Sequence, residues 1–482
     1  MTPTAPPSPP ARSRALRAVG LVLSGQVLAQ GLGLARTVVL ARLLGPHAMG
    51  VAAAVTLLLA FLEALGDAGA DRLLVQAPDG DDPRLQAAAH TAGLVRAAGL
   101  ASLSVVLGLA LAGPLGVRAQ RWDCLWVAAI LVVRGGAHLD VRRFQRTFRF
   151  APGARVDVVA AAVALAVAAP LALLLRDETA VLVATLVQSA VATALSHVAA
   201  ERPWTLGADR ARLRRIAAFA WPLAVNGALF FAFLQGDRVL LALGASKEEL
   251  GRFGAAFALG VLPTVLLARV TQNLALPYLS GARTGAELDR RSREVSTVVG
   301  VAAATFGGLF AAVGGAVVAA LWGGAFRPDA ALATAVAAGA VGRLLREGPV
   351  AASLSRGDAR SVLASNVVRL VGLALAVVAL LADGGTAAIV GAAAAGEVAA
   401  LVHASRRLRR HGLAPRTVLA PAVPAVLALA AGGAAAAGAS GTAALLGAAA
   451  VAAAATALGR VLGRRTAGAP ALAPPCGSEA AT

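Results

Sequence analysis

Long apolar runs recur along the chain and are separated by short stretches of polar and charged residues. Because a helix needs ~20 apolar residues to cross ~30 Å of hydrocarbon, each run predicts one transmembrane helix. The predicted spans cover residues 18–41, 48–68, 89–112, 122–141, 156–175, 179–200, 216–243, 253–276, 295–321, 329–354, 361–381, 386–404, 417–437 and 442–463. The pattern therefore predicts an all-α polytopic membrane protein with about 14 spans.

The polar stretches divide the chain into predicted parts. The opening MTPTAPPSPP and the basic stretch after it predict a disordered basic N-terminal arm at residues 1–17. The first apolar run is too long for a signal peptide and lacks a small-residue cleavage site, so it predicts an uncleaved helix. The other predicted parts are an N-lobe of six helices (18–200), a cytoplasmic linker (201–215), a C-lobe of six helices (216–410), two additional helices (411–463) and a disordered tail (464–482).

Basic residues mark one side of the predicted membrane. The chain has 44 Lys+Arg, of which 29 fall in the segments on the N-terminal side of the membrane and 7 in the segments on the other side. By the positive-inside rule, both termini are expected in the cytoplasm, in a multi-pass protein of the plasma (inner) membrane. The outside segments are short, which argues against a glycosyltransferase or ligase that works through a large external loop.

Two segments of the chain echo each other. Residues 35–50 read ARTVVLARLLGPHAMG, and residues 237–251 read DRVLLALGASKEELG. In both, an arginine precedes an apolar run that ends a predicted helix, and a short turn then ends in glycine. Because Arg36 and Arg238 lie in the first and seventh predicted helices, the two halves would share one orientation, as in transporters built from parallel repeats around a central cavity. Chance similarity between two helices rich in Ala and Leu is the alternative.

The composition argues against several function classes. A net charge of +19 would suggest nucleic-acid binding in a soluble protein, but with 58% hydrophobic residues there is no polar domain to form such a surface. No P-loop, H-E-x-x-H or G-x-S-x-G motif is present, and Cys124 and Cys476 lack the spacing of a metal site. We therefore expect no enzyme, no catalytic residue, no metal, no cofactor and no nucleic-acid partner.

Eight arginines fall inside predicted spans, where a charge is costly and normally faces a cavity or a partner. Arg96 and Arg134 lie close to the inside face, and snorkelling of the guanidinium into water is the favoured interpretation for both. Arg36 and Arg238 are similarly close to the outside face, and both interpretations stay open for them. The candidate residues for an anion-binding cavity are Arg36, Arg238, Arg269, Arg343, Arg346 and Arg369.

Three acidic residues within the spans are candidates for charge pairing or ion coupling. Glu347 follows Arg343 by four residues, so the two can pair along one helix face. Glu397 lies in mid-span without an arginine in its own helix, and it is either the partner of a cavity arginine, which we favour, or an ion-coupling group. Asp237 directly precedes Arg238.

Several stretches resemble a known family. The segments are QVLAQGLGLARTVVLARLLGPHAMGV (26–51), EALGDAGADRLLVQ (63–76) and FLQGDRVLLALGASKEELGRFGAAFALGVLPTVLLARVTQNLALPYLS (233–280). They are similar to polysaccharide-export flippases of the Wzx type, within the superfamily that includes multidrug exporters and the lipid II flippase. Arg36 resembles in its context the first-helix arginine of the lipid II flippase, which favours a cavity position for it.

The resemblance implies a fold, a cargo and partners. The implied fold is two six-helix lobes around a cationic central cavity that works by alternating access. The implied cargo is a polyprenyl-pyrophosphate-linked oligosaccharide, flipped across the membrane for a surface polysaccharide such as a lipopolysaccharide or an exopolysaccharide. Membrane lipids are expected partners, and a polysaccharide polymerase and chain-length machinery are further candidates.

Two other functions are weighed against this one. A multidrug or metabolite cation antiporter of the sister branch needs a carboxylate for its cation, but arginines within the spans outnumber acids. A membrane scaffold without transport activity gains nothing evident from the cost of charges within the membrane.

Overall fold

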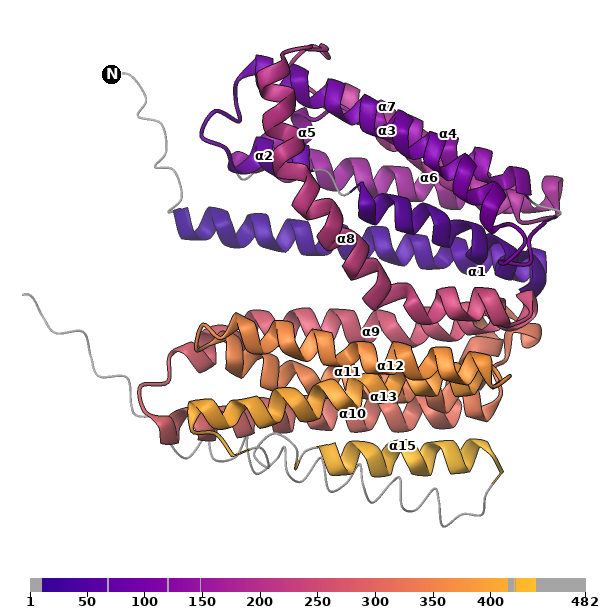
Figure 1. Ribbon diagram of the computed structural model, residues 1–482, viewed down its shortest axis with the longest axis vertical. Coiled ribbons are helices and arrows are strands. Elements are labelled where there is room, and N and C mark those ends of the chain that lie inside the picture. The colour runs from indigo at the N-terminus through magenta and orange to yellow at the C-terminus, as the bar shows by residue number, and fades with distance from the viewer. Residues whose placement is uncertain are drawn as a thin grey trace, which may run out of the picture. The chain divides into compact units, whose positions relative to one another are not determined.

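The computed structural model describes residues 11–66, 69–118, 121–147, 149–414, 420 and 422–438. Within these ranges the chain forms helices joined by short connections, and no strand occurs there (Figure 1). The predicted all-α class is therefore confirmed. Three predicted features lie outside the described residues: the first ten residues of the arm, the span at 442–463 and the tail at 464–482.

The chain forms two compact units. Unit 1 comprises Met1–Ala258 and Val318–Arg327, and unit 2 comprises Leu259–Val317 and Pro328–Thr482. Helices α9 (Lys247–Ser280) and α10 (Gly285–Trp322) contribute to both. The other helices of unit 1 are α1 (Ala11–Leu65), α2 (Gly69–Gln76), α3 (Pro83–Leu111), α4 (Cys124–Gly135), α5 (Asp140–Arg146), α6 (Ala151–Leu175), α7 (Thr179–Val198) and α8 (Arg210–Gly244), with the 3-10 turns η1 (Arg121–Asp123) and η2 (Gly324–Phe326). Those of unit 2 are α11 (Ala330–Leu354), α12 (Ala359–Leu381), α13 (Thr386–Arg407), η3 (Leu408–His411) and α15 (Ala422–Ala436).

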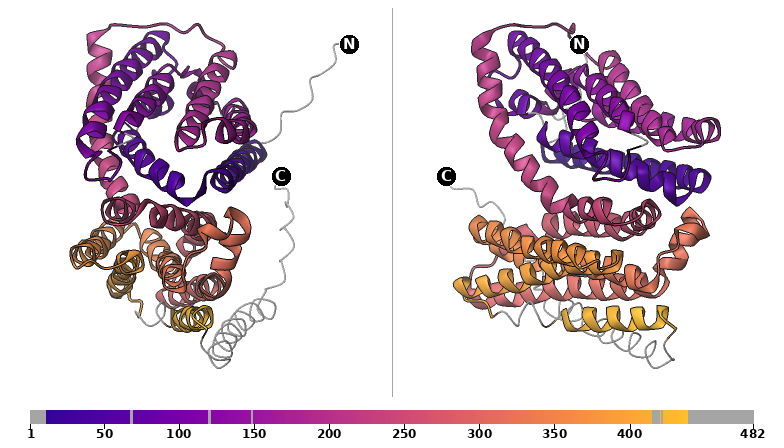
Figure 2. Two further views of the ribbon diagram at one scale, coloured as in Figure 1. Left: turned by 90° about the vertical axis from the view of Figure 1, so that its right-hand side faces the viewer. Right: turned by 45° about the vertical axis from the view of Figure 1, so that its right-hand side comes forward.

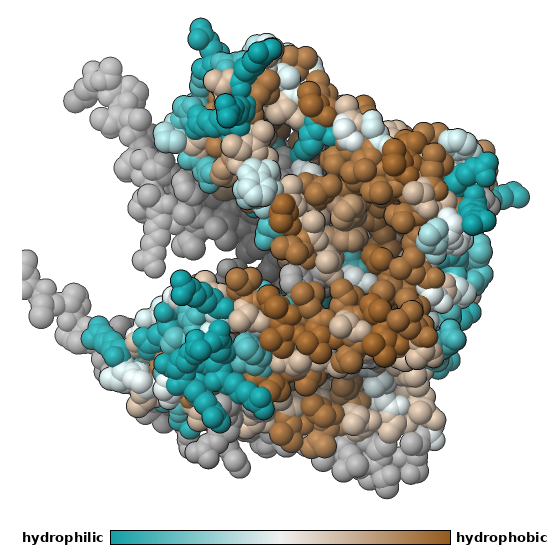
Figure 3. Space-filling model, viewed as in Figure 1, coloured by the Kyte–Doolittle hydropathy of each residue, from teal (hydrophilic) through white to brown (hydrophobic). Residues whose placement is uncertain are grey.

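The described part of the chain contains eight helices that are long and apolar enough to cross a membrane, or nine if the bent pair α4–α5 forms one span. On the face shown in Figure 3, hydrophobic residues cover the middle of the helices and hydrophilic residues gather at their ends. Large apolar side chains such as Val106, Leu174 and Val378 are exposed, as expected where lipid replaces water. The protein is thus a multi-pass membrane protein, but the predicted count of about fourteen spans is not confirmed.

Aspartates start several of the helices. Asp82, Asp209, Asp329 and Asp358 precede α3, α8, α11 and α12, and each side chain accepts a hydrogen bond from a backbone N–H of the first turn. The first N–H groups of a helix have no partner within it, so these carboxylates satisfy donors that would otherwise be unpaired. Polar residues at the ends of the apolar runs thereby set where the helices begin.

A kink divides α1 into two predicted spans. Gly45 has a φ of 81°, and Pro46 follows it within the helix. Glycine adopts this left-handed conformation without strain, and the proline ring removes a helical hydrogen bond, so the helix bends here. The kink falls between the spans predicted at 18–41 and 48–68.

The two echoing segments pack against each other within unit 1. A Cβ atom added to Gly50 would lie 1.7 Å from the Lys247 carbonyl oxygen, and one added to Gly251 would lie 2.2 Å from the Pro46 carbonyl oxygen. Each turn therefore ends in a glycine because the backbone of the other turn lies against it. Beside this contact, His47 Nδ1 and Glu248 Oε1 are 2.7 Å apart.

The span predicted at 122–141 is not one continuous helix. The structure ends α4 at Gly135 and begins α5 at Asp140, with an angle of 53° between the α4 and α5 segments. Gly135 and Gly136 stand at the break, where glycine readily leaves the helical conformation. Hydrophobicity alone does not reveal such a break in the sequence, because Ala137 and Leu139 are as apolar as the helix before them.

Small residues let the helices approach closely. Ala160, Ala164, Ala168 and Ala172 are spaced four residues apart on one face of α6, and all are buried. In unit 1, α6 packs against α1 and α7, and in unit 2, α13 packs against α11 and α12; Figure 2 shows these helices side by side from two directions. Alanine and glycine thereby let these helices pack with their backbones close together.

Candidate functional site

Unit 2 holds three arginines around one carboxylate. Glu397 of α13 lies with Oε1 3.1 Å from Arg369 Nε and 3.5 Å from Arg343 Nε, and with Oε2 3.4 Å from Arg346 Nε. Arg343 and Arg346 come from α11, and Arg369 comes from α12. Three helices therefore bring together four of the residues predicted from the sequence as charged groups of a cavity.

This arginine cluster is buried. Arg346 is 8% exposed, and Glu397 is 4% exposed. Among the basic side chains, the guanidinium group of arginine keeps its charge most strongly on burial. The three guanidinium groups exceed the single carboxylate, so the cluster carries an excess of positive charge inside a membrane protein, where an uncompensated charge is costly.

Glu347 has a different partner from the one predicted. Its Oε2 accepts a hydrogen bond from Gln272 Nε2 at 2.8 Å, and the described contacts of Glu347 include no ion pair with Arg343. Asn366 of α12 supplies another neutral partner, because its Oδ1 accepts from Arg346 Nη1 at 2.7 Å. Amide side chains thus complete the cluster without adding charge.

Glycines allow the helices of the cluster to meet. A Cβ atom added to Gly396 would lie 2.4 Å from the Arg369 carbonyl oxygen and 2.7 Å from Gly372 Cα. A Cβ added to Gly342 of α11 would lie 2.8 Å from Glu397 Cβ. Backbone contact between α12 and α13, and side-chain contact with α11, therefore fix the distances among the charged groups.

Unit 1 contains a cavity of about 810 Å³. Its lining includes Arg96, Arg134 and Arg142 together with Asp71 and Asp157. Apolar residues of α3, α6 and α8 form much of the remaining wall. The cavity is large enough for a small ligand and presents charged groups of both signs.

Arg134 bridges two helices at the wall of this cavity. It forms an ion pair with Glu63 of α1, and its Nε donates to Ser189 Oγ of α7 at 2.9 Å. Arg36 donates from Nη1 to Gln188 Oε1 at 2.6 Å, and Gln188 is itself a lining residue. Arg36 therefore reaches a residue of the cavity wall.

Arg96 and Arg134, for which snorkelling is the favoured interpretation from the sequence, both line this cavity. The helix α4 ends at Gly135 directly after Arg134, and the Arg134 side chain contacts α1 and α7.

The remaining predicted residues have other surroundings. The Arg238 guanidinium lies over the ring of Phe257, 3.9 Å from its centroid, in a cation–π contact. Asp237 Oδ1 accepts from the Arg238 backbone N–H at 2.9 Å. The side chain of Arg269 lies outside the described part of the structure.

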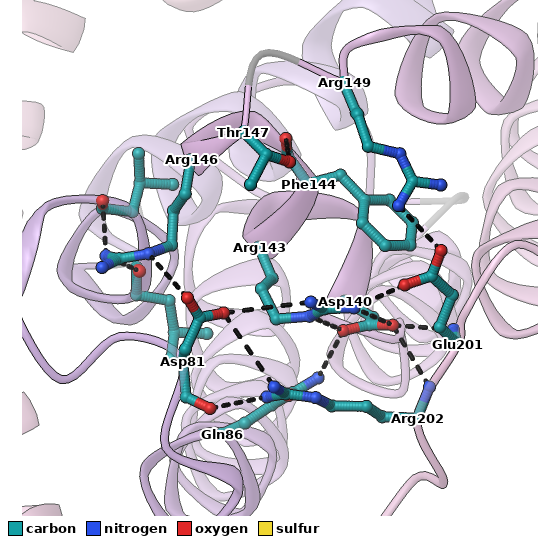
Figure 4. A network of polar contacts seen from close by, with 12 residues as sticks. Asp81, Gln86, Asp140, Arg143, Phe144, Arg146, Thr147, Arg149, Glu201 and Arg202 are labelled. Carbon is teal, nitrogen blue, oxygen red and sulfur yellow. Dashed lines mark hydrogen bonds and ion pairs between the residues drawn. The ribbon is translucent and has the colours of Figure 1, made fainter. Parts of the chain in front are cut away.

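A polar network ties the connection between α7 and α8 to the rest of unit 1 (Figure 4). Asp140 is fully buried and accepts from Arg143 Nε at 2.5 Å and from the backbone N–H groups of Glu201 and Arg202 at 2.7 and 3.2 Å. Arg149 and Arg143 pair with Glu201 and hold the pKa of its carboxyl below the usual value. The network fixes the segment that leads to α8.

Two histidines join the same segment, and a third, His197, packs against one of them. His90 Nε2 accepts from the Leu139 N–H at 3.2 Å, so its Nδ1 carries the proton and donates to the Thr205 carbonyl at 3.0 Å. His138 Nδ1 accepts from the Asp140 N–H at 3.1 Å, so its Nε2 donates to the Arg202 carbonyl at 3.0 Å. Both rings are therefore neutral. His90, His138 and His197 are far apart in the sequence and meet only in the folded unit.

Comparisons with known proteins agree with this architecture. Residues 39–330 match the family model described as polysaccharide biosynthesis protein. A search of curated proteins finds no match. Among solved structures, the lipid II flippase MurJ in an inward closed conformation is similar with a TM-score of 0.65 and 10% identity, over 92% of this chain and 99% of that one.

Transporters of the MATE family are also similar in fold. A multidrug resistance MATE transporter of the MOP superfamily, in an inward-facing conformation, has a TM-score of 0.55 and 14% identity, over 80% of this chain and 95% of that one. The Vibrio cholerae transporter VcmN has a TM-score of 0.51 and 14% identity, over 83% and 97%. At these identities the likeness concerns the fold alone.

Proposed function

This chain belongs to the polysaccharide biosynthesis protein family and has the fold of flippases and transporters, and from that premise we propose that it flips a polyprenyl-pyrophosphate-linked oligosaccharide across the membrane. The cargo's glycan would then enter a surface polysaccharide. The proposed setting is the plasma (inner) membrane, with both termini in the cytoplasm and with a polymerase and chain-length machinery acting on the product.

The arginine cluster around Glu397 is the observation that carries this proposal. A pyrophosphate group is an anion that cannot cross hydrocarbon without replacing its hydration. Guanidinium groups donate two parallel N–H bonds to phosphate oxygens and stay charged when buried. Three of them in one buried cluster, in a chain of this family, favour an anionic cargo over a neutral one.

Transport would proceed by alternating access, since the MurJ and MATE folds are those of transporters. The lobes predicted at 18–200 and 216–410 are the parts that would move against each other, and the helices at 411–463 are an addition to that core. Arg36, Arg238 and Arg269 are proposed as further contacts of the anion along its path.

A cation antiporter is the weaker candidate. It needs a buried carboxylate that is available to the cation. Glu63 is paired with Arg134 and Glu397 lies among three arginines, so of these three acids it is Glu347, which accepts from Gln272, that has no arginine partner among the described contacts. Resistance to ethidium or norfloxacin on overexpression would favour that candidate.

The proposal predicts that removal of the arginine cluster abolishes export. In cells that depend on this chain for a surface polysaccharide, the double change Arg343→Ala and Arg346→Ala should lower export by at least about tenfold, because each buried charge–phosphate contact contributes about 2 kcal/mol or more. Arg293→Gln is the matched control, since Arg293 is exposed and pairs with Asp289 of the same helix. Unchanged export, with normal protein levels on immunoblots, would remove these arginines from the cargo path.

A further inference from the structure

The arginine cluster of unit 2 contains more positive charge than its carboxylates balance. Arg343, Arg346 and Arg369 contribute three charges, against one from Glu397 and one from the neighbouring Glu347. Glu347 is 6% exposed and accepts from Gln272, and the described residues add no ion pair from it to an arginine. A further anionic group would therefore complete the charge balance.

The fit between Glu397 and its three partners is loose. All three ion pairs run to the Nε atoms, at 3.1 to 3.5 Å, whereas a charge-assisted N–H···O⁻ bond is ~2.7–2.9 Å long. Within the described part of unit 2, neither Glu397 Oε2 nor Arg346 Nε has a hydrogen-bond partner.

A phosphate group suits the same donors better. In a pyrophosphate diester such as the proposed cargo, two phosphorus atoms carry four non-bridging oxygens in tetrahedral arrangements, whereas a carboxylate offers two oxygens in one plane. Arg343 and Arg346 of α11 and Arg369 of α12 offer three guanidinium groups to these oxygens. The carboxylate of Glu397 therefore occupies, with an imperfect geometry, a position for which a phosphate would be the stronger ligand.

We propose that Glu397 is an internal counter-ion, which the phosphate or pyrophosphate group of the cargo displaces from Arg343, Arg346 and Arg369. This inference rests on the proposed function for the identity of the cargo. In the empty protein, Glu397 prevents an uncompensated positive charge in the membrane. When the cargo leaves, Glu397 returns to the arginines and offsets the loss of their ligand. The arginines therefore do not trap the anion.

The first test is a binding titration with the full-length chain purified in detergent. Inorganic pyrophosphate is the probe, and a polyprenyl pyrophosphate in mixed micelles is a second probe that separates a free anion from a lipid headgroup. Glu397→Gln keeps the side-chain shape and removes the competitor, so it should bind pyrophosphate about tenfold more tightly than the unchanged chain.

Glu287→Gln is the matched control. It removes a carboxylate of the same unit whose described ion pair is with Arg291 of its own helix, and its affinity for pyrophosphate should stay within about threefold of the unchanged chain. Equal or weaker binding by Glu397→Gln would overturn the inference. Equal tightening by both variants would also overturn it, since the effect would then be one of net charge alone.

A second measurement uses the unchanged chain and does not depend on the folding of a variant. Carbodiimide labelling of carboxyl groups, followed by mass spectrometry of peptides, reports how available Glu397 is. Saturating pyrophosphate should increase labelling of Glu397 severalfold and leave Glu347 unchanged. Constant or reduced labelling of Glu397 would contradict displacement.

The inference and the proposed function fail in different experiments. If Glu397→Gln binds no more tightly but cells without the chain accumulate a lipid-linked glycan, the flippase proposal stands and the counter-ion is wrong. If binding tightens as expected but lipid-linked glycans are unaffected by loss of the chain, the anion site stands and the cargo is wrong.

Discussion

At the scale of single residues, Asp140 combines several interactions in one buried carboxylate. It accepts from Arg143 and from two backbone N–H groups of the segment between α7 and α8. An amide at this position can accept on one side only, and its NH₂ group would face a donor. Burial then makes each unsatisfied group costly.

Asp140→Asn should therefore lower the free energy of unfolding by about 3 kcal/mol. Asp81→Asn is the control, because Asp81 is 57% exposed and its ion pairs with Arg143, Arg146 and Arg202 are 3.6–4.0 Å long; its cost should be about 0–1 kcal/mol. Thermal unfolding of the detergent-solubilised chain, followed by tryptophan fluorescence, compares the two. Similar melting temperatures for both variants would show that the network does not anchor the segment.

The neutral histidines predict a response to pH. His90 and His138 each accept a backbone N–H and donate to a carbonyl. Protonation turns both ring nitrogens into donors, so the folded network favours the neutral rings. Its stability is therefore present above the ordinary imidazole pKa of about 6.5 and is lost as the pH falls below it.

Hydrogen exchange of residues 199–209, corrected for intrinsic rates, should accordingly rise between pH 7.5 and 5.5. His138→Gln is the matched variant, since a glutamine amide accepts and donates but does not titrate in this range. It should reduce the pH response. A response that is equal in both proteins would assign it to another group.

At the scale of elements, the contact between α12 and α13 depends on glycine. Gly396 lies against the backbone of Arg369 and Gly372, so a larger side chain must separate the two helices. Gly396→Val should cost about 3 kcal/mol and should also move Arg369 away from Glu397.

Gly391→Val tests the same change on the same helix at a position where no other atom lies within 4 Å of the added Cβ. It should have little effect, because valine is no worse than glycine in a helix interior. Gly396→Val should lower both the melting temperature and surface-polysaccharide export, whereas Gly391→Val should change both little. Comparable defects in both would mean that helix propensity, and not interhelical contact, is responsible.

Hydrophobic patterning could predict the helices but not how they break and meet. The apolar runs give the ends of α11, α12 and α13 to within about two to four residues. The break after Gly135 could not be predicted from the apolar run at 122–141, because residues that follow the break are apolar too. The spacing of Arg343 and Arg346 indicates a shared face of α11, but only the close packing at Gly342, Gly372 and Gly396 brings Glu397 and Arg369 to that face.

At the scale of the whole molecule, charge and resemblance together predicted the class of protein. The spans, the excess of arginine and the segments at 26–51 and 233–280 indicated a membrane protein of a polysaccharide-export family, and the family match places the chain in the polysaccharide biosynthesis protein family. The cavity of unit 1 could not be predicted in the same way, since its wall is assembled from α2 through α8. The position of Arg96 or Arg134 along its own helix does not tell which neighbouring helices its side chain faces.

The central claim is that the chain flips a completed lipid-linked oligosaccharide. The most direct test is mass spectrometry of polyprenyl-linked glycans in cells that make a surface polysaccharide and lack this protein, with the restored gene as control. The account predicts accumulation of a completed pyrophosphate-linked oligosaccharide together with loss of the surface polymer. Unchanged lipid-linked pools in those cells would contradict it and would indicate a different cargo.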